Sequence, residues 1–175
     1  MKLRLLAAVT AVLSGLLAAA APSASAAALD ATCTGTTATG YAPGLLLLTE
    51  RPTLVSQSHV LTVCKSQADP AIKSATSFSS GLGSLSCLAL GAAGNGTQTI
   101  TWNTGDTTTF FFNRTRTILA GLTADVLNGV VIAGKFQGDS VVVTVTGLIA
   151  NPLGCLSATG LLTASGPVTV EITST

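Results

Sequence analysis

The segment 98–117, QTITWNTGDTTTFFFNRTRT, decides the fold class. In each of its halves, large apolar residues occur at every second position, which is the period of a β-strand with one buried face. The turn-forming residues between the two halves predict a β-hairpin. Four side chains then share the buried face, and we expect them at the centre of the core: Ile100, Trp102, Phe110 and Phe112.

The loop of this hairpin sets the register of its two strands. A three-residue loop at 104–106 places Ile100 opposite Phe110 and keeps the large apolar residues on one face. A two-residue loop pairs Trp102 with Thr107 and exchanges the buried face, because a shift by one residue turns every side chain to the other side. We therefore expect the three-residue loop.

Other segments after residue 26 show the same two-residue period. Aliphatic residues occupy every second position of 141–145 and of 168–172, and residues 137–140 form a hairpin turn before the first of these. The segment 122–127 fits either a strand or a short helical turn. Further strands are expected at 34–41, 53–64, 72–78 and 84–90. Short strands with turn residues between them predict an all-β domain, either a sandwich or a barrel.

Length and composition limit the function classes. The chain has 175 residues, which fits one domain, and it is 47% apolar and only 9% charged. This composition excludes a highly charged disordered protein. The formal net charge of +1 excludes a nucleic-acid binder that works through a basic surface. The apolar runs after residue 26 are far shorter than the roughly 20 residues that span a bilayer, so we expect no membrane span in the mature protein.

The first 26 residues have the pattern of a secretory signal peptide. Lys2 and Arg4 precede a mostly apolar run, and the sequence Ala-Ser-Ala at 24–26 offers a cleavage site. We therefore expect a signal peptide at 1–26, a β domain at 27–175 and a secreted, extracellular protein. Loss of the signal peptide leaves six basic and seven acidic residues, which is a net charge of −1.

All four cysteines lie in the expected mature domain: Cys33, Cys64, Cys87 and Cys155. An even number of cysteines in an oxidising compartment predicts two disulfides, each worth roughly 3 to 5 kcal/mol if it acts by reducing the entropy of the unfolded chain. Three pairings are open, and we prefer Cys33–Cys64 with Cys87–Cys155. No two cysteines have the C-x-x-C spacing and His59 is the single histidine, so we expect no metal site.

Five short pieces of the mature chain form a recognisable series. They are CTGT at 33–36, GSLSC at 83–87, GTQTITW at 96–102, DTTTF at 106–110 and GKFQGD at 134–139. In this order they resemble small secreted proteins of actinobacteria whose function is not characterised. The resemblance spans most of the mature chain. It implies a single immunoglobulin-like antiparallel β-sandwich with two disulfides after the signal peptide, and it implies no catalytic residue and no ligand.

The enediyne-binding apoproteins provide a second comparison. They are also small exported sandwiches that are rich in Ala, Gly and Thr and contain four cysteines. Their disulfides close short local loops, whereas the nearest cysteines here, Cys64 and Cys87, are 23 positions apart. The cysteine spacing therefore argues against a carrier of that family.

The sequence offers few residues for catalysis. His59 is the only imidazole, and we expect it to face solvent from a strand, on the same side as Gln57 and Leu61. No G-x-S-x-G element is present. Asp106 and Asp139 occupy turn-like sequences, where Asp commonly bonds to the backbone, although they would form a hydrolase pair if they met at one end of the fold. We expect no catalytic residue and no cofactor.

One unusual segment consists of four consecutive leucines: Leu45, Leu46, Leu47 and Leu48. These side chains cannot all lie on one face of a strand. The segment is either a strand buried on both faces or a loop folded over the core, or it is an exposed apolar patch that binds a protein partner or a second copy of the chain. In the last case Glu50 and Arg51 would form its polar rim.

We expect a non-catalytic exported domain that acts by binding or as a component of the cell envelope, because ionisable groups are scarce. The sequence specifies no ligand or partner. The alternative is an inhibitor of secreted serine proteases, in which residues 151–155 form a braced loop and Leu153 fills the specificity pocket of the enzyme. The same residues also fit an ordinary turn before a strand. A hydrolase that uses Asp106 and Asp139 is a third hypothesis.

Overall fold

The computed structural model describes residues 28–90, 93–119, 122–148 and 152–175. The signal peptide expected at 1–26 lies outside the described residues, so it stays a prediction. The described residues form eight strands and one short helix. Their bounds are β1 (Leu29–Leu45), β2 (Arg51–Ser66), β3 (Ala75–Leu85), β4 (Ala93–Trp102), β5 (Thr107–Leu119), β6 (Leu122–Gly134), β7 (Ser140–Leu148), α1 (Pro152–Leu156) and β8 (Leu161–Thr173).

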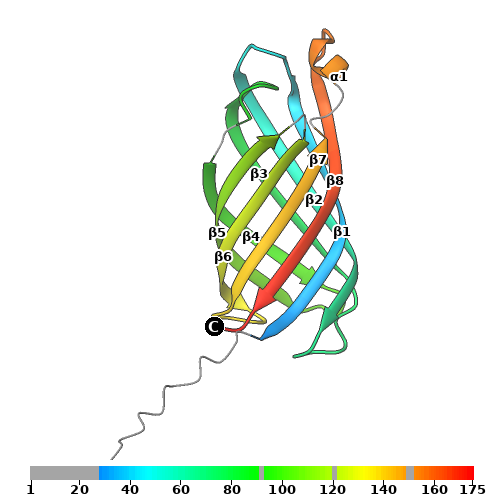
Figure 1. The fold of residues 1–175 in the computed structure, drawn as a ribbon, viewed down its shortest axis with the longest axis vertical. Coiled ribbons are helices and arrows are strands. Elements are labelled where there is room, and N and C mark those ends of the chain that lie inside the picture. Colours follow the sequence, from blue (N-terminus) through cyan, green and yellow to red (C-terminus); the bar gives the residue numbers. More distant parts are fainter. Residues whose placement is uncertain (1–27, 91–92, 120–121, 149–151) are drawn as a thin grey trace, which may run out of the picture.

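The eight strands form one closed antiparallel β-barrel. Each strand pairs with the next along the chain, and β8 pairs back with β1 from Leu29 opposite Thr173 to Gly40 opposite Thr163. Figure 1 shows β1 and β8 side by side in a wall of tilted strands, with α1 at the end opposite the C-terminus.

The expected immunoglobulin-like sandwich is therefore wrong. The two-residue period requires one buried face on each strand, and sandwiches and barrels both satisfy this requirement. The two architectures differ in whether the first and last strands pair, and β1 and β8 do pair here. The period within single strands contains no information about that pairing.

Figure 1 shows the C-terminus at one end of the barrel, and we call the half next to it the lower half. Apolar side chains fill this half. Of the four residues expected at the centre, Ile100, Trp102 and Phe110 are buried, and Phe112 is half-buried against them. The aliphatic sets of β7 and β8 point into the same cluster, as predicted: Val141, Val143, Val145, Val168, Val170 and Ile172. This lower core closes one end of the barrel.

The hairpin of β4 and β5 confirms the predicted faces but not the predicted register. Ile100 lies opposite Thr108, and Gln98 lies opposite Phe110, so the pairing differs from the expectation by two residues. A shift of two keeps every side chain on its face, so the apolar pattern does not detect it. Trp102 supplies the physical reason, because its Nε1 donates a hydrogen bond to Thr108 Oγ1 at 2.8 Å inside the barrel.

The strands expected at 34–41 and 53–64 are confirmed as parts of the longer β1 and β2. The segment 122–127, which fitted either a strand or a short helical turn, belongs to the strand β6. The strands expected at 72–78 and 84–90 are only partly right, because one strand, β3, contains residues from both. After β3 the chain leaves the wall and crosses the end of the barrel next to α1. We call this half of the barrel the upper half.

A second, smaller apolar cluster, the upper cluster, closes the upper end. Its buried members are Leu45, Cys87, Leu90, Cys155 and Leu161. Two connections cross there, and the amide nitrogens of Cys87 and Leu88 donate to the carbonyl oxygens of Leu46 and Leu47 at 2.8 and 3.3 Å. Both ends of the barrel interior are therefore covered by apolar side chains.

Both disulfides follow the pairing preferred from the sequence. Cys33 and Cys64 join directly opposite positions of β1 and β2. Cys87 and Cys155 join the connection after β3 to α1. The second disulfide thus ties together two of the segments that cover the upper end.

Candidate functional site

The wall of the barrel is incomplete between β3 and β4. These strands pair only through 75–78 and 99–102. Farther up, residues 79–85 pair with β2 and residues 93–98 pair with β5, but no described pair joins these two segments to each other. The wall therefore opens in the upper half, and two strand edges border the opening.

The inward positions beside the opening are held by glycines: Gly81, Gly83, Gly94 and Gly96. A Cβ atom added at Gly96 would lie 3.2 Å from the ring of Phe112, and one added at Gly81 would meet nothing within 4 Å. Glycine thus leaves space at positions where other strands of the barrel carry large side chains. This missing volume hollows the upper half.

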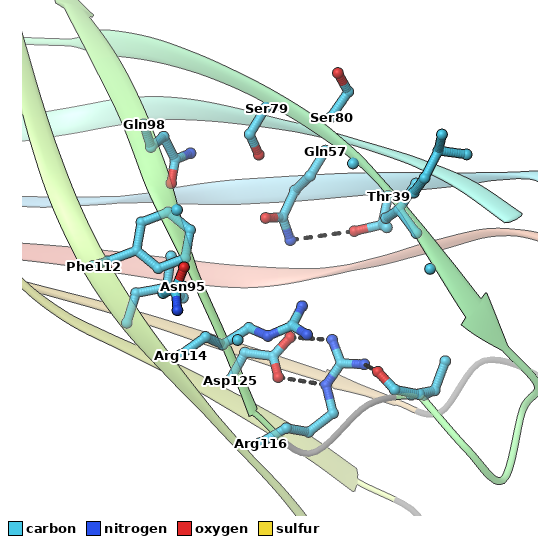
Figure 2. Close-up of a pocket in the computed structure, with 18 of the residues that line it drawn as sticks. Thr39, Gln57, Ser79, Ser80, Asn95, Gln98, Phe112, Arg114, Arg116 and Asp125 are labelled. Atoms are coloured by element: carbon cyan, nitrogen blue, oxygen red, sulfur yellow. Dashed lines mark hydrogen bonds and ion pairs between the residues drawn. The ribbon is translucent and has the colours of Figure 1, made fainter.

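A cavity of about 650 Å³ lies behind the opening. Its floor is formed by Phe112 and Leu127 of the lower core, and its ceiling by Tyr41, Leu85 and Leu90 at the upper cluster. Polar side chains line the space between them, and Figure 2 labels Thr39, Gln57, Ser79, Asn95, Gln98, Arg114, Arg116 and Asp125. This volume is in the range of pockets that bind small organic molecules.

A largely buried ion pair forms one side of the cavity (Figure 2). Arg116 of β5 and Asp125 of β6 lie opposite each other in the register, and the guanidinium bonds to both carboxylate oxygens. Arg116 Nη1 also donates a hydrogen bond to the carbonyl oxygen of Leu90 at 2.8 Å. Although burial acts to lower it, the hydrogen bond and charge of Asp125 raise the pKa of Arg116. The two charges are fixed in place and compensate each other.

Arg114 lies on the same face of β5 as Arg116, but no carboxylate of the described residues forms an ion pair with it. Its Nε atom is buried and makes no hydrogen bond with any residue that the structure describes. Burial, followed by the nearby charge of Arg116, lowers the pKa of Arg114. Since Asp125 already pairs with Arg116, the lining of the cavity carries one uncompensated positive charge.

On β1 to β4, buried polar residues lie between the cavity and the apolar side chains of the lower core. Thr37, His59 and Ser77 lie opposite one another across β1, β2 and β3. Gln98 of β4 donates a hydrogen bond to Ser77 Oγ at 2.7 Å. Within the described part of the chain, Thr37 Oγ1, Gln98 Oε1 and both ring nitrogens of His59 have no hydrogen-bond partner. The interior therefore keeps unused hydrogen-bonding groups directly below the cavity.

The prediction that His59 faces solvent is wrong. His59 does share a face with Gln57 and Leu61, but that face is the interior of the closed barrel, and the imidazole is only 2% exposed. Burial lowers the pKa of His59 to about 4. The imidazole is therefore neutral at physiological pH.

The two carboxylates of the hydrolase hypothesis lie in connections at the lower end, and each has a different partner. Asp106 accepts a hydrogen bond from Lys135 Nζ at 3.0 Å, and the same Nζ bonds to Asp69. Burial, followed by a hydrogen bond with Asp30, raises the pKa of Asp139. These contacts tie the connections to one another and do not join Asp106 to Asp139.

The four leucines fit the interpretation of a loop folded over a core. Leu45 is fully buried in the upper cluster, Leu46 and Leu47 are half-buried, and Leu48 is 73% exposed. Arg51 does not form a rim, because its guanidinium bonds to the carbonyl oxygen of Gly44. An apolar patch of four exposed leucines is not present.

The segment of the protease-inhibitor hypothesis contains a helix. Residues 152–156 form α1, which is neither the expected turn nor an extended loop, and Asn151 lies outside the described residues. Leu153 is 71% exposed on this helix, and Cys155 is held by its disulfide to Cys87. The disulfide does brace this segment, as the inhibitor hypothesis requires, but the backbone of residues 152–156 is helical and not extended.

Sequence reasoning missed the residues of the cavity, although two signals for them are visible. Gly81 and Gly83, and again Gly94 and Gly96, are spaced by two, so each pair removes volume from one face of a strand. The apolar period of β5 also continues into charged residues at 114 and 116. Charged side chains on a buried face indicate a polar interior.

The comparisons with known proteins give no match: no protein-family model, curated protein or solved structure is similar to this chain. The resemblance to small secreted proteins of actinobacteria therefore stays a prediction. None of the described helices is long and apolar enough to cross a membrane. Over the described ranges, no three His, Cys, Asp or Glu side chains gather in a way that would hold a metal ion.

Proposed function

We propose that this protein is a non-catalytic exported binding protein that holds a small organic molecule in the upper half of its barrel. The cavity of about 650 Å³ between the two apolar clusters carries this proposal. The interior of an eight-stranded barrel is just wide enough either to be filled by side chains or to hold one small ligand. In the upper half the glycines beside the opening leave the space for a ligand.

The unpaired polar atoms in the lining support a ligand rather than an empty space. Gln98 Oε1 and Arg114 Nε lack hydrogen-bond partners among the described residues and both side chains line the cavity. A buried polar group without a partner costs roughly 1 to 3 kcal/mol. A bound molecule, or water in its absence, would remove this cost. The two disulfides fit an oxidising, extracellular environment.

The other functions considered have less support. The inhibitor hypothesis needs a loop that can enter a protease in extended form, and residues 152–155 belong to the helix α1. The hydrolase hypothesis needs Asp106 and Asp139 to face each other, and each is bonded to a different residue. The partner patch needs exposed leucines, and three of the four are at least half-buried.

A cavity-filling variant tests the proposed function. N-phenylnaphthylamine is a neutral aromatic probe whose fluorescence rises in an apolar site, and we expect the wild-type protein to bind it. Gly81→Phe should abolish this binding, because Gly81 lines the cavity and a Cβ atom there meets nothing within 4 Å, which leaves room for the ring to occupy the cavity. Thr76→Phe is the matched control, since it adds the same ring to an exposed position of β3 outside the cavity.

Binding that survives Gly81→Phe, or that both variants remove equally, would show that the probe binds elsewhere on the barrel. Far-UV circular dichroism and the mass of the oxidised protein establish that each variant is folded with both disulfides. Native mass spectrometry of protein recovered from culture medium adds a direct readout. It should detect retained small molecules on the wild type and none on Gly81→Phe.

A further inference from the structure

We infer that the natural ligand carries an anionic head group, bound by Arg114, on an apolar body that lies against the ring of Phe112. This inference rests on the proposed function, because it names the class of ligand for the same cavity. It combines four features of the described lining: the charge, the free donor of Arg114, the glycine opposite it and the apolar floor.

The charge of the lining favours an anion over a cation or a neutral molecule. The charged residues that line the cavity are Arg114, Arg116 and Asp125. Arg116 and Asp125 form a bidentate pair whose side chains are 13% and 9% exposed, so their charges are already matched. The remaining charge of Arg114 is partly removed from water and lies beside a second cation, and an anion would compensate it.

The guanidinium of Arg114 is accessible from the cavity. Residue 94, opposite it on β4, is a glycine, and even a Cβ atom there would lie 3.5 Å from Nη2 of Arg114. Gly94 therefore places no side chain between the guanidinium and the cavity. This group presents its donors in a fixed fork that matches the two oxygens of a carboxylate, phosphate or sulfonate. The buried Nε of Arg114 provides one donor that no described residue uses.

The rest of the lining suits an apolar or aromatic body. Phe112 packs against Phe110 with ring centroids 6.0 Å apart, which holds its ring in place at the floor of the cavity. Aliphatic side chains surround the same space: Val55, Leu85, Leu90 and Leu127. A small inorganic anion would leave this surface unused, so an amphipathic organic anion fits the whole cavity better.

Gln98 adds a point of specificity near the floor. Its side chain is 3% exposed, its amide nitrogen donates to Ser77, and its Oε1 has no partner in the described part of the chain. An acceptor of this kind matches a hydroxyl or N–H group on the body of the ligand. Figure 2 shows Gln98 next to Phe112, with Arg114 beside the ion pair.

Two probes that differ by one sulfonate group test the role of Arg114. Anilinonaphthalene sulfonate has the aromatic rings of N-phenylnaphthylamine and adds one sulfonate. We expect the wild type to bind the sulfonate more tightly. Arg114→Met should weaken binding of the sulfonate by about tenfold or more, because a hydrogen bond to a charged group is lost. Binding of the neutral probe should not change, and Arg114→Lys should keep part of the preference.

Lys65→Met is the matched control, because it removes one positive charge from an exposed position of β2 outside the cavity. It should leave the affinities for both probes unchanged. The inference is overturned if Arg114→Met affects neither probe or weakens both to the same extent. Failure of the proposed function looks different, since the neutral probe would then bind Gly81→Phe as well as it binds the wild type.

Displacement of the sulfonate probe then identifies the chemistry of the head group. Decanoate, decyl phosphate and decanol have the same chain and differ only at the head. We expect at least one of the two anions to displace the probe at a lower concentration than decanol does, and to lose this advantage in Arg114→Met. Equal displacement by all three compounds would overturn the inference, because Arg114 would then not select a charge.

Discussion

The two halves of the barrel share the same strands, yet one half is packed and the other is hollow. On β4 the inward positions change from Ile100 and Trp102 in the lower half to Gly94 and Gly96 in the upper half. The pairing of β4 with β5 continues through both halves without interruption. The hollow is therefore produced by the choice of side chain and not by a break in that part of the wall.

The neighbouring strand β5 also differs between the two halves, but there the inward side chains change from apolar to charged. On β5 the fully buried Phe110 is followed, on the same face, by Phe112 at the floor and then by Arg114 and Arg116. One strand thus contributes to the packed core at one end and to the polar lining at the other. Stability and ligand binding therefore depend on different parts of the same strands, and we expect mutations to affect them separately.

Two phenylalanines on β5 give the largest expected effect and the strongest test of this separation. Phe110→Ala should lower the free energy of unfolding by about 3 to 5 kcal/mol, because its ring is fully buried in the lower core. Phe112→Ala should lower it by roughly half as much or less, because its ring is half-buried and borders the cavity. Urea unfolding, followed by the fluorescence of the single tryptophan, Trp102, measures both.

The order should reverse for binding. Phe112→Ala should weaken the binding of N-phenylnaphthylamine strongly, because Phe112 lines the cavity. Phe110→Ala should weaken it less while the protein stays folded, because Phe110 only supports the ring of Phe112 from the lower core. Equal losses of stability in the two variants would contradict the distinction between a packed and a hollow half.

The pH dependence of stability tests the buried polar residues between the two halves. We expect the change in the free energy of unfolding here to be intermediate in size. Burial lowers the pKa of His59 to about 4 in the folded protein, against an ordinary value of about 6.5 in the unfolded chain. The unfolded state therefore takes up this proton first as the pH falls. The neutral imidazole therefore makes its full contribution to the free energy of unfolding above pH ~6.5. This contribution decreases by about 3 kcal/mol as the pH falls to ~4.

His59→Leu isolates this contribution, because the carboxylates titrate in both proteins and cancel in the comparison. The stability of the wild type relative to the variant should fall between pH ~7 and ~4 and then level off. Urea unfolding at several pH values measures the difference. A constant difference over this range would mean that His59 reaches solvent or a proton acceptor in the folded state.

The ion pairs at the lower end should have the smallest effect. Lys135 bonds to Asp69 and Asp106, and these hydrogen bonds raise the pKa of Lys135 and lower the pKa of both carboxyl groups. The side chains of Lys135, Asp69 and Asp106 are 25%, 25% and 53% exposed, so water and salt screen their attraction. Lys135→Met should lower the thermal unfolding midpoint slightly in low salt and not measurably in high salt. A large decrease of the midpoint that persists in high salt would show that the ion pairs of Lys135 with Asp69 and Asp106 hold this end together.

The secondary structure could largely be predicted from the sequence, but its closure into a barrel could not. The period at 98–117 identified the inward residues of β4 and β5, and the aliphatic positions of β7 and β8 were equally clear. Alternation acts within one strand and needs only one buried face. The pairing of β1 with β8 joins segments more than a hundred residues apart, and no local pattern specifies such a contact.

The candidate site was harder to predict, because it depends on the absence of side chains. Gly91 to Gly96 have the composition of a flexible turn, yet 94 and 96 belong to β4 and face the cavity. His59 has the neighbours expected of an exposed strand residue, and only closure of the barrel buries it. Local composition favours a turn for these glycines and solvent exposure for His59, whereas the geometry of the closed wall turns them inward.

The chain could begin and end at either of two places in the barrel wall, which we call seams: between β8 and β1, and between β3 and β4. At the first seam the ends of the described wall are bonded neighbours, since the amide nitrogen of Ser174 donates to the carbonyl oxygen of Ala28 at 2.9 Å. The second seam, between β3 and β4, has only four paired positions on each strand. A circular permutant that links these ends and begins at β4 would keep the same wall. It would place both new termini beside the opening, where a fluorophore or a tether could be attached next to the cavity.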